Sequence, residues 1–404
     1  MEGHSSKINV MHSNLIYKEM KDPAMLSRYY KMNAFKIEGR SEIQGDSPTD
    51  LFIGRFGWPN VTIGPLVPNA FGDTAIMSAP EMWRKLTIPK IFEMRLSLVR
   101  GMHKTSVFSV EKGRVEQMVR DLALSDKPAT SQIEFSRSLG TPRKLDDDIS
   151  PFGPSGFLKS FEVENTRAER HLQMAYSDTD MLASDAIFEL YNKGTAISKI
   201  QKGLSAGLFG RGERRTFVPT RWSITAVDDT ISKANLRQVK EFETIDCIQA
   251  YYNVALDNRW LIFLLPGDWE YESIEAWYPK TTWNDTSNIS ICGSYEPYKG
   301  RSKYAEIGGC YYSGRLAITE ELKRQKRQAA ALILREVHSG YTAPVGVWNV
   351  REHVRETLEG DAIAINGVGE MIRMIGEKLE IPLSDWVKSS SILSRIIKQK
   401  TLSA

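Results

Sequence analysis

The residue types best suited to chemistry gather in one segment, residues 202–229, KGLSAGLFGRGERRTFVPTRWSITAVDD. A glycine-rich stretch leads there into Arg211, Arg214 and Arg215, and Arg221 follows. Glycine lets backbone amides approach an anion closely, and the guanidinium group binds phosphate oxygens in pairs. The segment is therefore a candidate phosphate-binding site for a nucleic-acid backbone or a nucleotide. A mobile surface loop is the alternative interpretation, and both remain open at this point.

Two adjacent carboxylates end the same segment. Apolar and polar residues alternate over residues 221–226, which favours a strand that ends at Asp228 and Asp229. Neighbouring strand residues point to opposite faces, so one carboxylate can line a pocket while the other caps a helix beginning near Thr230. A carboxylate at a strand end can hold Mg²⁺ together with substrate phosphates. Asp228 and Asp229 are thus the candidate catalytic residues of an alternative function, a metal-dependent nuclease or phosphotransfer enzyme; no other cofactor or metal site is indicated.

Several common classes of protein are excluded. The sequence contains neither the Gly-x4-Gly-Lys-Ser/Thr phosphate loop, nor His-Glu-x-x-His, nor a calcium-binding loop. Its three cysteines, Cys247, Cys292 and Cys310, are too few and too widely spaced for a disulfide framework or a paired-cysteine zinc site. The longest strongly apolar run, Trp260 to Leu265, is far shorter than the roughly 20 residues that cross a bilayer. We expect a cytoplasmic protein with no membrane partner.

Composition and periodicity predict an α+β fold with a sheet-rich central region, flanking helices and a helical C-terminal region. The 404 residues are 41% hydrophobic and 25% charged, which is typical of a globular protein of about two domains. The net charge of +3 is too small to indicate nucleic-acid binding by itself. The expected regions are a peripheral segment 1–45, an N-terminal region 46–140, a Pro/Gly-rich linker or loop 141–157, the central region 158–315, the helical region 316–398 and a tail 399–404.

Individual elements follow from the spacing of apolar residues. Two helices around one strand are predicted over residues 88–124, and a helix over 178–193 that Gly194 ends. Strands are predicted at 248–256 and 260–265. Helices are then predicted over 319–340, 349–358, 370–379 and 384–397.

Four long blocks of this sequence resemble the archaeal Nre family of DNA-repair proteins. The central one is RRTFVPTRWSITAVDDTISK, residues 214–233, and the others begin at residues 47 (SPTDLFIGRFGWPNVTIGPLVP), 153 (GPSGFLKSFEVENTRAERHLQMAYSDTDMLASDAI) and 335 (REVHSGYTAPVGVWNVREHVRE). The resemblance implies participation in DNA-damage repair and a link to the replication sliding clamp through a C-terminal peptide. Members often carry an N-terminal cysteine cluster suited to zinc, whereas no cysteine precedes Cys247 here, so we expect no structural zinc.

The C-terminal residues QKTLSA match the opening of a clamp-interacting box. In such a box Gln399 and Leu402 would fill small pockets, and a following pair of aromatics would bury most of the area. The aromatic pair is missing here, which predicts weak binding to the clamp, PCNA. The basic run at 323–327 is typical of a solvated face, with a contact to DNA as the alternative. The basic residues near the C-terminus suit nonspecific contacts with DNA phosphate; they are Lys388, Arg395, Lys398 and Lys400.

Aromatic residues beside glycine and proline form a further feature. Phe56 and Trp58, in RFGWPNV, could stack on unpaired bases, but packing in a small core is the favoured interpretation. The leading hypothesis is a DNA-repair factor that binds DNA through Arg211, Arg214, Arg215 and the basic C-terminal helices and acts with the sliding clamp. The alternatives are the Mg²⁺-dependent enzyme and a nucleotide-binding regulator that uses the glycine-rich stretch.

Overall fold

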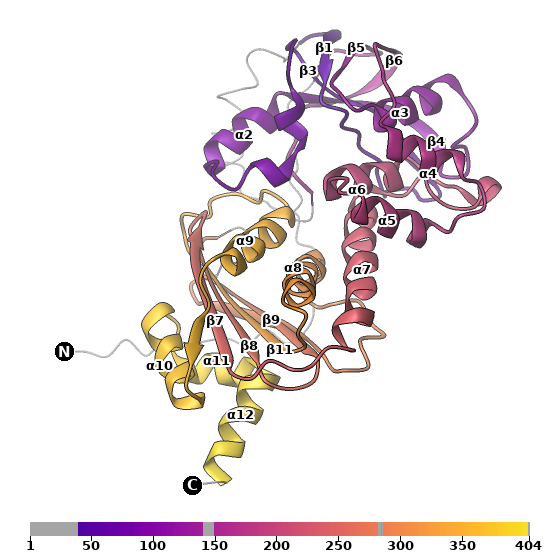
Figure 1. The fold of residues 1–404 in the computed structure, drawn as a ribbon. Coiled ribbons are helices and arrows are strands. Elements are labelled where there is room, and N and C mark those ends of the chain that lie inside the picture. Colours follow the sequence, from indigo (N-terminus) through magenta and orange to yellow (C-terminus); the bar gives the residue numbers. More distant parts are fainter. Residues whose placement is uncertain (1–38, 140–148, 282–283, 285, 403–404) are drawn as a thin grey trace. The chain divides into compact units, whose positions relative to one another are not determined.

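The structure is a computed structural model that describes residues 39–139, 149–281, 284 and 286–402, with side chains described as far as Lys398. These residues form two units, divided between Ile231 and Ser232, and each contains a six-stranded mixed sheet with helices (Figure 1). The α+β prediction is confirmed. Much of the expected peripheral segment and residues 141–148 of the expected linker lie outside the described residues.

The sheet of the N-terminal unit has the strand order β1-β5-β6-β4-β2, with β3 also paired to β4. The pair β4 and β6 is parallel and the other pairs are antiparallel. The glycine- and proline-rich stretch after residue 45 forms short strands joined by turns. The strands are β1 Glu42–Ser47, β2 Asn60–Ile63, β3 Leu66–Pro68, β4 Leu98–Ser106, β5 Ala129–Phe135 and β6 Ser155–Glu164.

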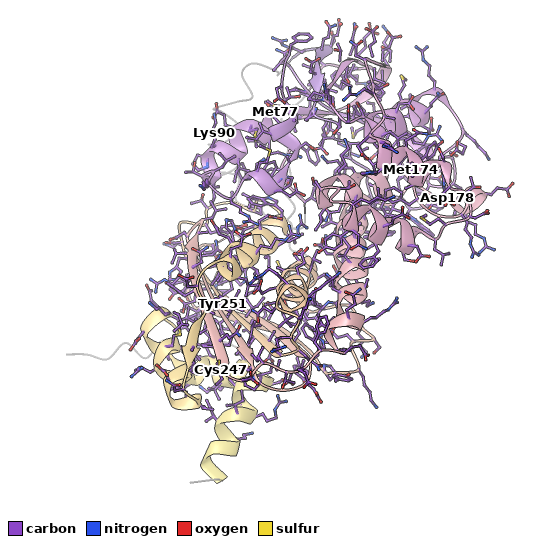
Figure 2. The ribbon with its side chains drawn as sticks, in the orientation of Figure 1. Met77, Lys90, Met174, Asp178, Cys247 and Tyr251 are labelled. Carbon is purple, nitrogen blue, oxygen red and sulfur yellow. The ribbon has the colours of Figure 1, made fainter. Side chains whose placement is uncertain are left out.

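The helices of this unit confirm two predictions and shorten a third. Residues 88–124 form a helix, a strand and a helix, as expected. The helix expected over 178–193 is shorter, because the Asp178 carboxylate accepts hydrogen bonds from the backbone of Asp180 and Met181 and fixes a turn there (Figure 2). Gly194 ends this helix at φ 81°, as predicted. The helices are α2 Ile88–Leu96, α3 Arg114–Leu124, α4 Arg170–Ser177, α5 Ala183–Asn192 and α6 Ile197–Ser205, with 3-10 turns at Ala75–Ser78, Pro80–Met82 and Gly212–Arg214.

The strand predicted at residues 221–226 is wrong, because this stretch opens the 20-residue helix α7, Thr220–Val239. Its buried positions follow helical spacing, but several are polar, including Ser223, Asp228 and Ser232. Apolar periodicity gives no sign of such positions, and the local alternation of six residues then looks like a strand. The two units divide inside this helix.

The sheet of the C-terminal unit has the order β10-β9-β11-β8-β7-β12, in which only β9 and β11 are parallel. The strands predicted at 248–256 and 260–265 are confirmed, and the turn between them lies at Leu256 and Asp257, both at positive φ. Figure 2 marks Tyr251 on β7 and Cys247 just before it. The strands are β7 Ile248–Ala255, β8 Asn258–Leu265, β9 Glu270–Trp277, β10 Ser290–Glu296, β11 Ala330–Val337 and β12 Ile363–Ile365.

Helices cover both faces of this sheet. Alternate residues of β8 belong to two separate cores, Trp260, Ile262 and Leu264 to one and their neighbours to the other. The first core packs against α8 and α9, and the second against α10, α11 and α12 (Figure 1). The helices are α8 Gly309–Gln325, α9 Trp348–Glu359, α10 Val368–Lys378, α11 Leu383–Ser389 and α12 Ser391–Leu402. Among the described residues no helix is long and apolar enough to span a membrane.

The helix predicted over 319–340 is also wrong. Helix α8 begins ten residues earlier and ends at Gln325, and residues 330–337 form the central strand β11. Every residue of β11 is buried, because the strand has partners on both edges and helices on both faces. A strand buried on both faces shows no alternation, and the Ala, Leu, Arg and Glu of AALILREV also favour helix.

The helix predicted over 384–397 is interrupted, whereas those at 349–358 and 370–379 are confirmed. The break lies at Ser390, whose hydroxyl donates to the Glu272 carboxylate on β9. The same carboxylate accepts from the backbone N–H groups of Ser391 and Ile392, at 2.8 and 3.0 Å, and so caps the start of α12. A capping group from a distant strand gives no local signal in the sequence.

Candidate functional site

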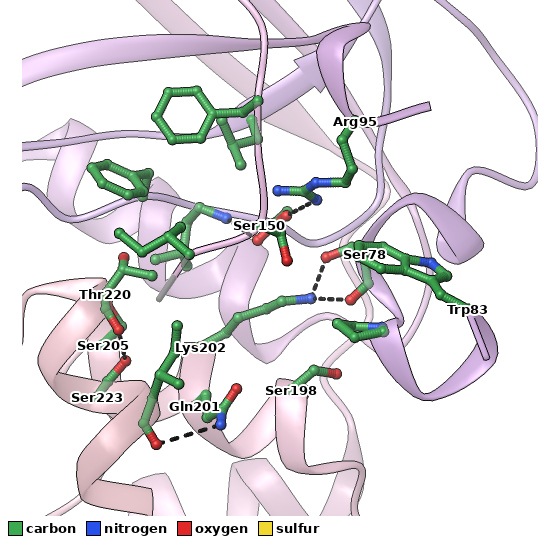
Figure 3. A pocket seen from close by; sticks show the side chains of 18 residues that line it. Ser78, Trp83, Arg95, Ser150, Ser198, Gln201, Lys202, Ser205, Thr220 and Ser223 are labelled. Carbon is green, nitrogen blue, oxygen red and sulfur yellow. Dashed lines mark hydrogen bonds and ion pairs between the residues drawn. The ribbon is translucent and has the colours of Figure 1, made fainter. Parts of the chain in front are cut away.

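A small pocket with several polar side chains lies inside the N-terminal unit, between α6, the start of α7 and three loops (Figure 3). Its volume is about 70 Å³. Hydroxyl, amide and charged groups share the lining with aromatic rings. The lining residues are Asp50, Leu51, Phe52, Leu66, Ser78, Pro80, Trp83, Arg95, Ile149, Ser150, Phe152, Ser198, Gln201, Lys202, Ser205, Thr220, Ser223 and Ile224.

Lys202 reaches from α6 into this pocket and points toward Ser78 (Figure 3). Its ammonium group donates to the Ser78 backbone carbonyl at 2.8 Å and also to the Ser78 hydroxyl. Burial lowers the pKa of Lys202, while the negative charges of Asp50 and Glu81 act in the opposite direction. The neighbouring Lys199 donates to the Ser125 carbonyl, and burial together with the charge of Lys202 lowers its pKa to about 8.

Asp50 and Arg95 form a buried ion pair on the opposite wall, with 2.6 Å between the Arg95 Nη1 and Asp50 Oδ2 atoms. Arg95 also donates to the carbonyls of Met77 and Pro151, so its guanidinium group is held from three sides. Burial alone would raise the pKa of Asp50. The charges of Lys202 and Arg95, with hydrogen bonds from Arg95 and Ser78, instead hold it below its ordinary value.

The pocket can hold a few water molecules or one small anion. Two cations, Lys202 and Arg95, face one carboxylate, Asp50, and hydroxyl donors surround them. A volume of about 70 Å³ is well below the roughly 300 Å³ at which pockets for organic ligands begin. In this form it is too small for a nucleotide, so it gives the nucleotide-regulator alternative no support.

Sequence reasoning missed this pocket, although one pattern pointed at it. Ser205 is the centre of Gly203-Leu204-Ser205-Ala206-Gly207, a Gly-x-Ser-x-Gly arrangement. A nucleophile elbow needs that serine on a turn between a strand and a helix, whereas Ser205 is the last residue of α6. Its hydroxyl donates to the Val218 carbonyl at 2.7 Å. Asp50, Arg95 and Lys202 are far apart in the sequence, and no spacing links them.

The arginine-rich loop lies in the same unit, but its residues do not line the pocket. Arg215 is buried and donates to the carbonyls of Tyr176, Asp178 and Gly210, at 2.7, 2.7 and 2.8 Å. Its guanidinium group thus holds the loop in place. Arg211 and Arg214 are exposed.

The glycine-rich stretch before this loop is neither a surface loop nor an open anion cradle, because residues 203–209 are buried. Gly207 and Gly210 have φ of 73° and 108°, where a side chain would be strained. A Cβ atom at Gly203 would lie 2.6 Å from the Phe209 ring. These glycines therefore serve the backbone path and close packing.

Asp228 and Asp229 occupy consecutive positions in the middle of α7, and not the end of a strand. Asp228 is fully buried and accepts a hydrogen bond from Gln201 Nε2 at 3.1 Å, which joins α7 to α6. Consecutive helix residues lie about 100° apart around the axis, so the two carboxylates do not face one ion. They do not fit a shared Mg²⁺ site. Arg221 is buried near the start of the same helix.

Several basic residues of the C-terminal unit are paired with carboxylates. Arg324 binds Glu321, Lys388 binds Asp385 and Arg395 binds Glu270. The run at 323–327 straddles the end of α8, where Lys326 adopts the left-handed conformation at φ 54°. The side chains of Gln399 and Leu402, in the expected clamp-interacting tail, lie outside the described residues.

The packing predicted for Phe56 and Trp58 is wrong, because their side chains are 75% and 54% exposed. They lie at the turn of a hairpin whose two sides are joined by the Gly54 N–H and the Thr62 carbonyl at 2.8 Å. The turn closes tightly, with Gly57 at φ 83°. A side chain at such a turn has no second layer to pack against.

Family models for the two halves of archaeal Nre proteins match residues 19–284, the N-terminal region, and 296–404, the C-terminal region. The chain belongs to the archaeal Nre family. It is 38% identical to the DNA repair protein NreB of Archaeoglobus fulgidus over 91% of this chain and 93% of that protein. It is 34% identical to the DNA repair protein NreA of Haloferax volcanii over 88% of this chain and 87% of that protein. No solved structure matches the chain significantly.

The sequence blocks that resemble the Nre family can be located in the structure. Asp50 lies in the first of the Nre-like blocks, and Arg214, Arg215 and Arg221 lie in the central one. The first block contributes Asp50, and the central one Thr220 and Ser223, to the pocket, whereas the pocket's cations Arg95 and Lys202 lie outside the blocks. The resemblance found in the sequence is thereby confirmed at the level of the family.

Proposed function

We propose that this Nre protein acts in DNA repair by binding DNA through its N-terminal unit. The supporting observation is the extent of the similarity: the relatives named as DNA repair proteins align with about nine-tenths of this chain. Both the N-terminal and the C-terminal regions of the family match this chain. This favours a shared repair role over similarity confined to a single domain.

Arg211 and Arg214 are the phosphate-binding residues in this proposal. Both side chains are exposed, on a loop that Arg215 fixes through three backbone carbonyls. A fixed loop loses little conformational freedom when its arginines bind a phosphate. Arg215 supports the loop, and Arg221 is buried, so neither is assigned a role in holding phosphate.

The test is a fluorescence-anisotropy titration of single-stranded, duplex and branched DNA at two salt concentrations. We expect Arg211→Ala/Arg214→Ala to weaken binding and to reduce the salt dependence of log K by about 0.9 for each phosphate that the variant no longer neutralises. Arg373→Ala is the matched control, because that arginine is exposed and already paired with Glu370 and Glu377. If wild-type protein binds no form of DNA, the proposal is wrong.

Contact with the sliding clamp is a second part of the proposal. It is supported by the partial box at Gln399 and Leu402, at the end of helix α12. A clamp-coated sensor should bind the full chain weakly, because the aromatic pair is missing, and should not bind a chain cut after Lys398. Equal binding of the full chain and the shortened chain would show that the tail does not contribute to clamp binding.

The metal-dependent nuclease is the less supported alternative. Its candidate carboxylates do not converge, and Asp228 is engaged by Gln201 in the joint between α6 and α7. A DNA-binding factor agrees better with the positions of these residues.

A further inference from the structure

An exposed aromatic cluster in the N-terminal unit has no role in the fold. Phe56, Trp58 and Phe108, here called the aromatic tip, are 75%, 54% and 61% exposed. Isolated apolar residues on a surface are ordinary, but a group of large rings left in water forgoes the stabilisation of burial. Of the described tryptophans, only Trp58 and Trp222 are more than a third exposed.

Backbone hydrogen bonds hold the aromatic tip together. Strands β2 and β4 pair Asn60 with Ser106, and the turns that carry Trp58 and Phe108 leave the two strands at this same end. The Val107 N–H donates to the Pro59 carbonyl at 2.9 Å and joins the two turns. The rings are therefore presented by ordered backbone and need little reorganisation to bind a ligand.

A third segment joins the same surface. The Phe217 N–H donates to the Val107 carbonyl at 2.9 Å, and the Thr220 N–H to the Ile53 carbonyl at 3.0 Å. Trp222, 46% exposed, lies two residues further along. The surface is thus built from three segments, residues 51–66, 98–110 and 216–227.

Two cations of these segments lie toward solvent, the half-buried Arg55 and the exposed Lys104. Arg100 and Arg221 are buried, and His103 lies 3.4 Å from the Glu116 carboxylate, so these three add no free charge to the surface. The Arg55 guanidinium carbon lies 5.1 Å from the centre of the Phe56 ring, and Lys104 is exposed. Aromatic rings among cations suit a ligand that combines flat π-surfaces with negative charge.

We infer that the aromatic tip stacks on unpaired bases of single-stranded DNA, with Arg55 and Lys104 beside the phosphates. Unpaired bases expose both faces of their rings, whereas the bases of a duplex are already stacked. This inference rests on the proposed DNA binding and adds the form of DNA recognised. Stacking tolerates any base, so we expect little sequence preference.

The experiment measures binding of a fluorescent single-stranded oligonucleotide and of the same strand with abasic positions. Phe56→Ala/Trp58→Ala should bind the normal strand roughly tenfold more weakly or worse, and Phe108→Ala should weaken it as well. Wild type should lose affinity for the abasic strand, which keeps the phosphates. On the abasic strand, Phe56→Ala/Trp58→Ala and wild type should have almost the same affinity. Trp58→Phe should retain most of the binding.

Phe71→Ala is the matched control, because Phe71 is 65% exposed in the same unit but lies near Asp46 and Asp73. It should change affinity by less than about twofold. If the tip variants bind like wild type while Arg211→Ala/Arg214→Ala does not, the stacking inference is overturned and the proposed function stands. If wild type binds no DNA, both fail. Equal wild-type affinity for normal and abasic strands would also overturn stacking.

Discussion

Asp50→Ala should lower the free energy of unfolding by about 3–5 kcal/mol, because it leaves the buried charge of Arg95 without its carboxylate. Arg95 and Asp50 lie 2.6 Å apart with side chains 4% and 9% exposed. Arg95 keeps its bonds to two carbonyls, so the loss concerns charge more than hydrogen bonding. Urea unfolding followed by circular dichroism measures the effect.

The control for this prediction is Glu93→Ala. Glu93 pairs with Lys90, but both side chains are about 60% exposed, so the expected cost is about 0–1 kcal/mol. Asp50→Asn keeps the shape of the side chain, so its free energy of unfolding should lie between those of Asp50→Ala and Glu93→Ala. Equal stability of Asp50→Ala and Glu93→Ala would show that the buried pair does not hold the pocket together.

The same prediction has a pH dependence. The pKa of Asp50 is held below the ordinary 3.8. Its contribution to stability is therefore complete above pH 3.8 and is lost as the pH falls through the lower pKa of the folded state. The difference between wild type and Asp50→Ala should be constant from pH 5 to 7 and should narrow only below pH 3.8.

Glu296→Leu should destabilise the C-terminal unit to a similar degree, about 3–5 kcal/mol. The Glu296 carboxylate is 1% exposed and accepts from Trp269 at 3.1 Å and from Tyr311 and Arg315 at 2.7 Å each. Removing it leaves the Arg315 charge buried without its carboxylate, and the Trp269 and Tyr311 donors without their acceptor. Burial, and then the charge of Glu296, raises the pKa of Tyr311, so this tyrosine remains a donor.

A double variant separates charge from packing. Glu296→Leu/Arg315→Met removes both charges and should be more stable than Glu296→Leu alone, because no ion is left buried without a partner. Glu377→Ala, at an exposed ion pair, should cost about 0–1 kcal/mol. A double variant less stable than the single one would contradict this explanation. Thermal unfolding of all four proteins provides the comparison.

The sequence by itself determined the family and those elements whose pattern is local. The strands β7 and β8 each have a clear signal, alternation in one and an unbroken apolar run in the other, with a tight turn between them. The helix, strand and helix over residues 88–124 follow from the spacing of apolar residues. The family follows from four long blocks of sequence that resemble Nre proteins. These features depend only on neighbours in the chain.

Tertiary structure decided the features that depend on distant partners. Strand β11 resembles a helix in sequence because it is buried on both faces, and α7 resembles a strand because its buried stripe is partly polar. The pocket combines Asp50, Arg95 and Lys202, which are charged residues of a kind normally found at the surface. Only pairing inside the fold makes their burial tolerable, since an unpaired ion in the interior costs several kcal/mol or more. The exposure of Phe56 and Trp58 is likewise set by the hairpin and by what packs around it, which residue type and spacing do not encode.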